Sequence, residues 1–479
     1  MRIKKCLQVL LVITLAFSLV ACGTKENDNN NNNNNNNNTG NNTGNTNENN
    51  QNTGNNTSTL PTIDSLKLGE DYTDLKATLK VLTHRTDIVD TKFADYVTEF
   101  KKMYPNITIN YEAVTDYRED IIIRLTTGDW GDICMIPTTV QKAELPDMFE
   151  SYGNYDKIGE NYEFIDNFSF NGEVYGIPST VNAQGVLYNK KVFQNAGISD
   201  LPKTPEEFLT ALQAIKDKTN AIPLYTNFAA GWTMVAWDAY IGGSATGDPE
   251  FMNNVLVHSK NPFSDRGDGT GPFAVYNVLY EAVKRGLVEE DPTTTDWEAS
   301  KGMLNRGEIG TMVLGSWAVT QMQEAGENPE DIGYMSFPIT VNGKQYASAG
   351  PDYCYGINVK SSDDNKIAAL LYVKYLTEQS NFAFSEGGIP IVKGAQYPEV
   401  YSMFADVELV VDKPAPAGEE TYLNDINTKS ELGINMENTH VQRIVEAALD
   451  NTETMEEIVK EWNARWSAAQ ADVGVTVNQ

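Results

Sequence analysis

Residues 171–193, NGEVYGIPSTVNAQGVLYNKKVF, decide the fold, because the local conformational signals change twice within this stretch. Gly172 and the Gly176-Ile177-Pro178 unit interrupt the chain, and Pro178 disfavours helix at the residue before it. A strand-like apolar run at 185–188 follows and leads into a helical segment. This pattern suits a chain that crosses from one lobe to another, although a strand-loop-strand unit within one domain has the same local signals.

The chain before this stretch alternates strand and helix signals. Apolar runs and alternation predict strands at 77–82, 107–111 and 133–136, and apolar residues at helical spacing predict helices at 93–104 and 117–125. Such an order is typical of an α/β lobe with largely parallel strands. Ligands of such sheets lie beyond the carboxyl ends of the strands, which points to the loop at 83–87 and the loop after Ile136.

The chain after the stretch carries two clear helix starts. Thr204 is a helix N-cap with Pro205 at the first helical position, and Thr454 with Glu457 forms a capping box. A strand at 310–314 is expected to deliver Gly315-Ser316-Trp317-Ala318 as a loop. Near Pro338 the chain is expected to return to the first lobe, for a strand at 354–359 and a helix at 367–376.

Length and charge narrow the class of protein. A chain of 479 residues is long enough for two lobes with separate cores. The formal net charge of -30 argues against nucleic acid as a partner, because phosphate binding needs clustered lysine and arginine. An acidic surface of this kind is otherwise typical of a soluble, non-aggregating protein.

The amino-terminal region predicts export. Residues 1–21 have a basic start and an apolar run shorter than the ~20 residues that a membrane-spanning helix needs. The segment ends Leu19-Val20-Ala21-Cys22, which resembles a bacterial lipobox and implies cleavage before Cys22 and lipidation of its thiol. An asparagine-rich tract follows with almost nothing apolar to bury, so residues 22–72 are predicted to be a lipid-anchored, disordered linker. The predicted location is therefore the outer face of the cell membrane.

The order of three motifs resembles a known family. YGIP at 175–178, LYNKKVFQNAGI at 187–198 and LPKTPEEF at 201–208 look like the extracellular solute-binding proteins of ABC importers. The resemblance is to their sugar-binding branch, family 1, similar to maltodextrin-binding proteins, and it covers the chain from about residue 75 to the end. It implies a two-lobed α/β fold with a ligand cleft between lobes joined by hinge crossings. The implied lobes are an N-terminal lobe of residues 73–180 and 338–378 and a C-terminal lobe of residues 181–337 and 379–479.

A sugar site combines aromatic rings with planar hydrogen-bonding side chains, because sugars present hydroxyls around a ring and apolar C–H groups on its faces. The resemblance implies that Trp232 and Trp317 stack on the sugar and that Asn182 and Gln184 contact its hydroxyls. Relatives often carry a carboxylate where Asn182 stands, so the hydroxyl pattern stays open. Further candidate ligand contacts stand in loops at strand ends: His84, Arg85, Asp87, Trp130, Asp352 and Tyr353. Each of these side chains has an alternative place in a solvated surface, a turn or the core, and Trp462 and Trp466 are assigned to the core.

The sequence gives little support for catalysis or metal binding. The three histidines are scattered without metal-ligand spacing, no GxSxG nucleophile motif is present, and the many carboxylates form no distinguishable acid and base pair. The run DRGDGTG at 265–271 lacks the EF-hand ligand series and the phosphate-loop lysine, and is interpreted as a surface turn. We therefore expect no enzyme activity, no cofactor and no bound metal. Cys134 and Cys354 are equally compatible with buried thiols and with a disulfide.

The sequence predicts a lipid-anchored solute-binding protein that captures an oligosaccharide and delivers it to an ABC transporter permease. Its expected partners are the sugar, the permease and the membrane through the anchor alone, and it is expected to be a monomer. Two alternatives remain open: a surface enzyme acting on polysaccharide, such as a lyase or glycosidase, and a binder of another solute such as a peptide, a polyamine or a metal complex.

Overall fold

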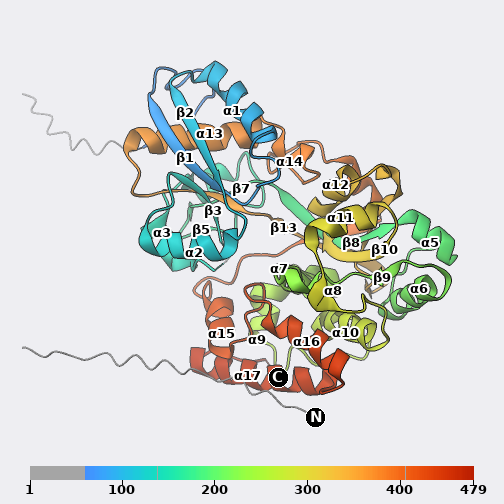
Figure 1. Cartoon of the computed structure of the whole chain (residues 1–479). Coiled ribbons are helices and arrows are strands. Elements are labelled where there is room, and N and C mark those ends of the chain that lie inside the picture. The colour runs from blue at the N-terminus through green and yellow to red at the C-terminus, as the bar shows by residue number, and fades with distance from the viewer. Residues whose placement is uncertain (1–59, 138, 405, 479) are drawn as a thin grey trace, which may run out of the picture. The chain divides into compact units, whose positions relative to one another are not determined.

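The computed structural model describes residues 60–137, 139–404 and 406–478 (Figure 1). The predicted signal peptide, Cys22 and the asparagine-rich tract lie outside the described residues. The structure differs from the predicted linker over residues 60–72. Ile63 is fully buried and donates its backbone N–H to the Tyr152 carbonyl at 2.9 Å, and Leu66 is also buried. These apolar residues offset the cost of ordering the segment, so the folded part begins earlier than residue 73.

The first sheet has five strands in the order β2-β1-β3-β14-β7. Its strands are β1 (Ala77–Thr83), β2 (Ile107–Ala113), β3 (Ile133–Ile136), β7 (Ile177–Pro178) and β14 (Cys354–Ile357). The first three run parallel, as predicted, whereas β14 is antiparallel to both β3 and β7. The helices α1 (Lys92–Met103) and α13 (Asp363–Glu378) lie beside this sheet (Figure 1), and α2 (Tyr117–Thr127) connects β2 to β3.

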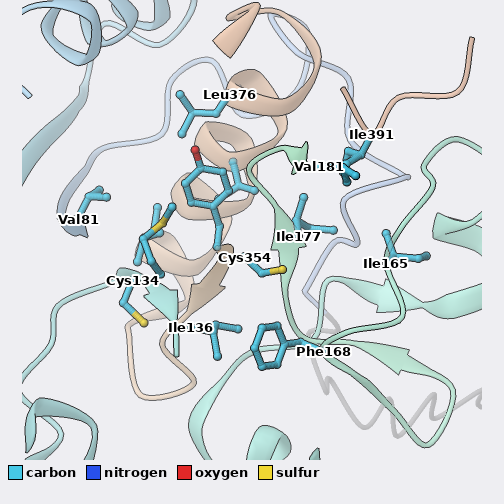
Figure 2. Close-up of a cluster of buried hydrophobic side chains, with 14 of the residues drawn as sticks. Val81, Cys134, Ile136, Ile165, Phe168, Ile177, Val181, Cys354, Leu376 and Ile391 are labelled. Carbon is cyan, nitrogen blue, oxygen red and sulfur yellow. The ribbon is translucent and has the colours of Figure 1, made fainter. Parts of the chain in front are cut away.

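The core of this sheet contains both cysteines of the folded part. Figure 2 shows Cys134 and Cys354 among buried aliphatic side chains such as Ile136 and Ile177. Both thiols are free. The register explains this, because Cys134 lies opposite Gly356 and Cys354 lies opposite Ile136, so the two cysteines are not aligned across the strands. Burial raises the pKa of each thiol well above its ordinary value.

The second sheet is built around the long strand β8. Strand β8 pairs with β10, β11 and β13 along its length, and β9, β12 and β15 extend the sheet. The strands are β8 (Val181–Asn189), β9 (Ile222–Leu224), β10 (Ile309–Gly315), β11 (Ile332–Ser336), β12 (Thr340–Val341), β13 (Lys344–Pro351) and β15 (Val407–Val411). Because β13 pairs with β8, the chain returns to the first sheet at Cys354 and not near Pro338, where the sequence had suggested the return.

The stretch 171–193 connects the two sheets, as its changing signals predict. Strand β7 pairs with β14 of the first sheet, and β8 of the second sheet begins three residues after the end of β7. A third segment runs beside this junction, where Val181 forms a β-bridge with Ile389. A Cβ atom at Gly388 would lie 1.9 Å from the Thr180 hydroxyl oxygen, so this close approach requires glycine.

The remaining elements are short strands and helices around the two sheets. The small third sheet contains β4 (Gly153–Asn154), β5 (Ser169–Phe170) and β6 (Glu173–Val174). The helices are α3 (Leu145–Met148), α4 (Tyr155–Ile158), α5 (Lys190–Ala196), α6 (Pro205–Lys218), α7 (Trp232–Val235), α8 (Gly243–Thr246), α9 (Leu256–His258), α10 (Gly271–Lys284), α11 (Trp297–Asn305), α12 (Trp317–Glu324), α14 (Phe382–Ser385), α15 (Tyr422–Ser430), α16 (Thr439–Asp450) and α17 (Met455–Val473).

The predicted helix starts are present. Thr204 caps α6 by accepting the Glu207 N–H at 3.3 Å, but the Glu207 carboxylate accepts the Lys203 N–H, so the box is not reciprocal. At α17 the box is complete, because Thr454 and Glu457 each accept the other's backbone N–H. Trp462 and Trp466 of the same helix are buried in the hydrophobic core that packs against the second sheet, as predicted.

Candidate functional site

Three tryptophans meet at the carboxyl end of strand β10. The ring centroids of Trp232 and Trp297 are 5.1 Å apart, and each lies 5.7 Å from the ring of Trp317. Each tryptophan is the first residue of its helix: α7, α11 and α12. Trp317 therefore begins a helix directly after β10, and the prediction that it stands in a loop was wrong. The Trp232 side chain remains 36% exposed, which leaves the cluster accessible to a ligand.

Two polar candidates stand on β8 next to this cluster. Gln184 lies opposite Gly315 of β10, and a Cβ atom at Gly315 would meet both the Trp317 indole at 2.8 Å and the Gln184 Oε1 at 3.3 Å. Glycine is needed here because these side chains approach each other over it. Asn182 is buried, and its Oδ1 accepts the Ser316 hydroxyl at 3.4 Å. The predicted amides and the tryptophans are thus brought together by the pairing of β8 with β10.

A second group forms at the carboxyl end of strand β1. The His84 ring lies 4.4 Å from the ring of Tyr353 and 5.9 Å from that of Tyr117. Burial, together with the charge of Arg85, lowers the pKa of His84 to about 3, so the imidazole is neutral at physiological pH. Its buried Nδ1 has no hydrogen-bond partner in the part of the chain that the structure describes. A neutral ring with one free nitrogen suits a hydrogen bond to a hydroxyl.

Arg85 does not extend freely from this loop. It donates to Asp87, with Nε 2.8 Å from Oδ1, and to the Glu386 carboxylate, with Nη2 2.5 Å from Oε2. Glu386 also accepts Lys92 Nζ at 2.7 Å. Although burial opposes it, the hydrogen bonds and charge of Arg85 hold the pKa of Asp87 below its ordinary range. Arg85 and Asp87 thus lie beside the histidine group but are engaged in an ion network with the segment after α14.

Two interactions connect the group at β1 with the group at β10. Burial raises the pKa of the Asp352 carboxyl, while hydrogen bonds from the Tyr353 N–H and the Asn182 side chain oppose that rise. Lys301 of α11 lies 4.9 Å from the Trp297 ring centroid, and its charge contributes to lowering the pKa of Asp87. These interactions link the segments that carry the two groups, and these segments belong to different sheets.

Trp130 lies apart from both groups. It precedes the start of β3, and Asp132 donates its N–H to the carbonyl of Lys80 in the middle of β1. It is therefore at the amino end of the parallel strands, whereas His84 follows the carboxyl end of β1. The Trp130 ring is 3% exposed and packs on Phe149 at 5.5 Å, which places it in the core.

Sequence reasoning missed three residues at the site. Trp297 completes the tryptophan cluster, Lys301 covers its ring, and Tyr117 packs against His84 and Tyr353. Trp297 follows Asp296, which caps α11 by accepting the Ala299 N–H at 2.9 Å. An aromatic residue directly after a helix cap was the available signal, because Trp232 and Trp317 also open helices.

The described residues also form surface pockets away from the two groups. Two surface pockets of about 410 and 390 Å³ lie at α17 and at α4, and neither is lined by a candidate binding residue. Residues 60–137, 139–404 and 406–478 contain no group of three or more histidine, cysteine, aspartate or glutamate side chains placed to hold a metal ion. Over the same ranges, no helix combines the length and the apolar character that crossing a bilayer requires.

A family model described as bacterial extracellular solute-binding protein matches residues 86–381, which is more than half of the chain. The chain belongs to this family. Its members are two-lobed α/β binding proteins, and this fold and the predicted family are therefore confirmed. The matched range includes the three helices that begin with Trp232, Trp297 and Trp317, and it begins two residues after His84.

Solved structures of similar proteins contain sugars. A manno-oligosaccharide-specific solute-binding protein from Bifidobacterium animalis subsp. lactis, in complex with mannotriose, is 48% identical with a TM-score of 0.84, covering 86% of this chain and 99% of that one. A binding protein of an ABC transporter from the same organism, in complex with mannobiose, has the same identity, TM-score and coverage. A multiple sugar-binding protein of Streptococcus mutans is 23% identical over 63% of this chain and 71% of its own length. These relatives are described as binding proteins and not as enzymes.

Proposed function

We propose that this solute-binding protein captures a manno-oligosaccharide outside the cell and delivers it to the permease of an ABC transporter. The observation that carries the proposal is the cluster of Trp232, Trp297 and Trp317 beside the side chains of Asn182 and Gln184. The similarity to the mannotriose-binding protein, at 48% identity over nearly its whole length, supports the choice of sugar.

The chemistry of the two groups suits a sugar. Indole faces pack against the apolar C–H face of a pyranose, and the geometry of three rings offers more than one such face. The amides of Asn182 and Gln184 and the neutral imidazole of His84 offer both donors and acceptors to hydroxyl groups. The charged side chains are mostly paired with each other, as for Arg85 with Glu386, so they do not favour an anionic ligand.

The ligand binds between the tryptophan cluster at β10 and the His84 group at β1. It therefore stabilises the closed state, in which these two groups lie closer together. A ligand that contacts both sheets shifts the population toward that closed state by its differential affinity. The hinge crossings in this proposal lie near Thr180 and at Asp352 to Tyr353, where the chain passes between the sheets. The N-terminal and C-terminal lobes predicted from the sequence, adjusted at these crossings, are the moving bodies.

The protein acts as a monomer held at the outer face of the membrane. Lipidation of Cys22 anchors it, and the asparagine-rich tract lets the folded part reach its ligand and the permease. The support is the lipobox and the composition of residues 22–58, together with membership of an extracellular family.

Calorimetry tests the proposal. The chain from Cys22, with serine at that position, is titrated with mannobiose and mannotriose, and with chitin oligosaccharides, raffinose, a short peptide and a polyamine as controls. We expect saturable binding of the manno-oligosaccharides at micromolar or lower concentration, and no new products when the mixture is analysed by chromatography after prolonged incubation. If neither mannobiose nor mannotriose binds and another solute does, the choice of ligand is refuted. Formation of products would refute the assignment as a binding protein.

A further inference from the structure

Glu289 is a buried carboxylate behind the segment that leads to Trp232. The residue is 7% exposed, and both of its carboxylate oxygens accept the Thr226 backbone N–H, at 3.2 Å for Oε1 and 3.0 Å for Oε2. Oε1 also accepts the Thr226 hydroxyl. Burial raises the pKa of the Glu289 carboxyl, and the hydrogen bonds from Thr226 oppose the rise. Taking a carboxylate out of water is unfavourable, so a residue that only filled this space would be better apolar.

The Thr226 hydroxyl transmits the contact along the chain. It donates to Glu289, and its oxygen accepts the Phe228 N–H at 3.2 Å, which begins the short 3-10 helix Phe228–Ala230. Asn227 between them has a φ of 56°, and its carbonyl accepts the Thr233 hydroxyl at 2.7 Å. Hydrogen bonds, joined through the backbone at 226–228, therefore connect Glu289 to helix α7, whose first residue is Trp232.

The same segment is bound to the loop that carries Trp297. The Ala229 N–H donates to the Thr295 hydroxyl oxygen at 2.8 Å. The Asp296 N–H donates to the hydroxyl oxygen of Tyr225, the residue before Thr226, at 3.0 Å. Since Asp296 is the N-cap of α11, these bonds place the start of that helix relative to the start of α7. The two loops form one hydrogen-bonded unit, and Glu289 holds it at Thr226.

We propose that Glu289 is a positioning residue for ligand binding, which sets the conformation of segment 226–231 through Thr226 and thereby holds the Trp232 ring against Trp297 and Trp317. The proposal rests on the proposed function for its link to affinity. Its link to the geometry of the tryptophan cluster does not depend on any ligand.

The acceptor oxygens of the side chain explain why glutamate stands at this position. A carboxylate only accepts hydrogen bonds, so the Thr226 hydroxyl must donate to it and keeps a lone pair for the Phe228 N–H. Glutamine would retain an acceptor for the Thr226 N–H but would add a competing donor. Alanine would leave both Thr226 donors without a partner. Glu289→Ala is therefore expected to disrupt the conformation of segment 226–231 more than Glu289→Gln does.

The experiment combines affinity with a spectroscopic signature. Glu289→Ala, Glu289→Gln, Thr226→Val and the double variant Glu289→Ala/Thr226→Val are prepared, with Glu290→Ala as the matched control because Glu290 is adjacent and exposed. Mannotriose affinity is measured by calorimetry. The exciton-coupled circular dichroism of the tryptophan cluster is measured without ligand, and its contribution is defined by the difference between wild type and Trp232→Phe. Thermal unfolding is recorded for every variant.

We expect Glu289→Ala to weaken mannotriose binding about tenfold and to diminish the tryptophan exciton band, while Glu290→Ala changes neither. Glu289→Gln is expected to bind mannotriose within about threefold of the wild-type affinity. The double variant is expected to bind it within about twofold of the affinity of Glu289→Ala, because both changes break the same path. If Glu289→Ala does not fold, Thr226→Val carries the same expectation for the band and for affinity.

Three results would overturn the positioning role: wild-type affinity and exciton band in Glu289→Ala, an affinity loss with an unchanged band, or penalties that multiply in the double variant. Failure of the wild-type protein to bind mannotriose would instead count against the proposed function. The circular dichroism comparison then decides the positioning role alone, because it needs no ligand.

Discussion

Replacing Trp317 by alanine removes one wall of the proposed sugar site. The ring contacts Trp232 and Trp297 on one side and passes over Gly315 beside Gln184, so its loss opens the centre of the cluster. A pyranose face resting on an indole removes on the order of 80 Å² of apolar surface from water, which at about 25 cal/mol per Å² contributes about 2 kcal/mol. We therefore expect the dissociation constant for mannotriose to rise about 30-fold.

Trp317→Ala should lower the free energy of unfolding less than truncation of a fully buried tryptophan does. Truncating a fully buried tryptophan costs about 3–5 kcal/mol, whereas Trp317 is only partly buried, so a loss of roughly 2 kcal/mol is expected. Trp130→Phe is the matched control, because Trp130 is buried at the amino end of the first sheet. It should lower the unfolding temperature without changing affinity. Calorimetric titration and thermal unfolding measure both quantities, and a Trp317→Ala variant that binds mannotriose within twofold of wild type would refute the site.

Three further predictions concern stability and reactivity. The pKa of His84 is about 3 in the folded protein and about 6.5 in the unfolded chain, so protonation favours unfolding as the pH falls below 6.5. In chemical denaturation at pH 4.5, His84→Gln should therefore recover about 2 kcal/mol of the free energy of unfolding. An equal loss of this free energy in both proteins between pH 7 and 4.5 would contradict the prediction. Cys134 and Cys354 should resist alkylation at pH 8 until the protein is unfolded, since burial raises both thiol pKa values, and rapid labelling of the native chain would show that the core opens. Thr454→Ala should cost about 1 kcal/mol through loss of the α17 cap, with Thr454→Ser as the control that restores it.

The local features of the fold were predictable because their causes are local. Alternation and apolar runs identified β1, β2 and β3, since a strand exposes its faces with period two, and the caps at Thr204 and Thr454 act over three residues. The crossing at 171–193 was also predictable, because Pro178 restricts its own backbone and that of Ile177, while glycine at 172 and 176 interrupts regular structure.

The site was predictable only in part. Trp232, Trp317 and the two amides of β8 were named from resemblance, and the structure places them together. Trp297 was missed because it stands far along the chain from β8, and only the packing of α11 on α12 brings it to the cluster. Trp130 was included because it flanks a strand, but its place at the amino end of that strand becomes evident only when the parallel register is known.

By itself, the sequence determined the acidic composition, the helix starts, the strand pattern and the family, because each depends on composition, on residues close together in the chain or on the order of motifs. Tertiary structure alone decided that β13 belongs to the second sheet, that Arg85 pairs with Glu386, and that three helices begin at one place with a tryptophan. The physical reason is that these contacts join residues distant in sequence, and their partners are selected by sheet register and burial, which no short segment of sequence specifies.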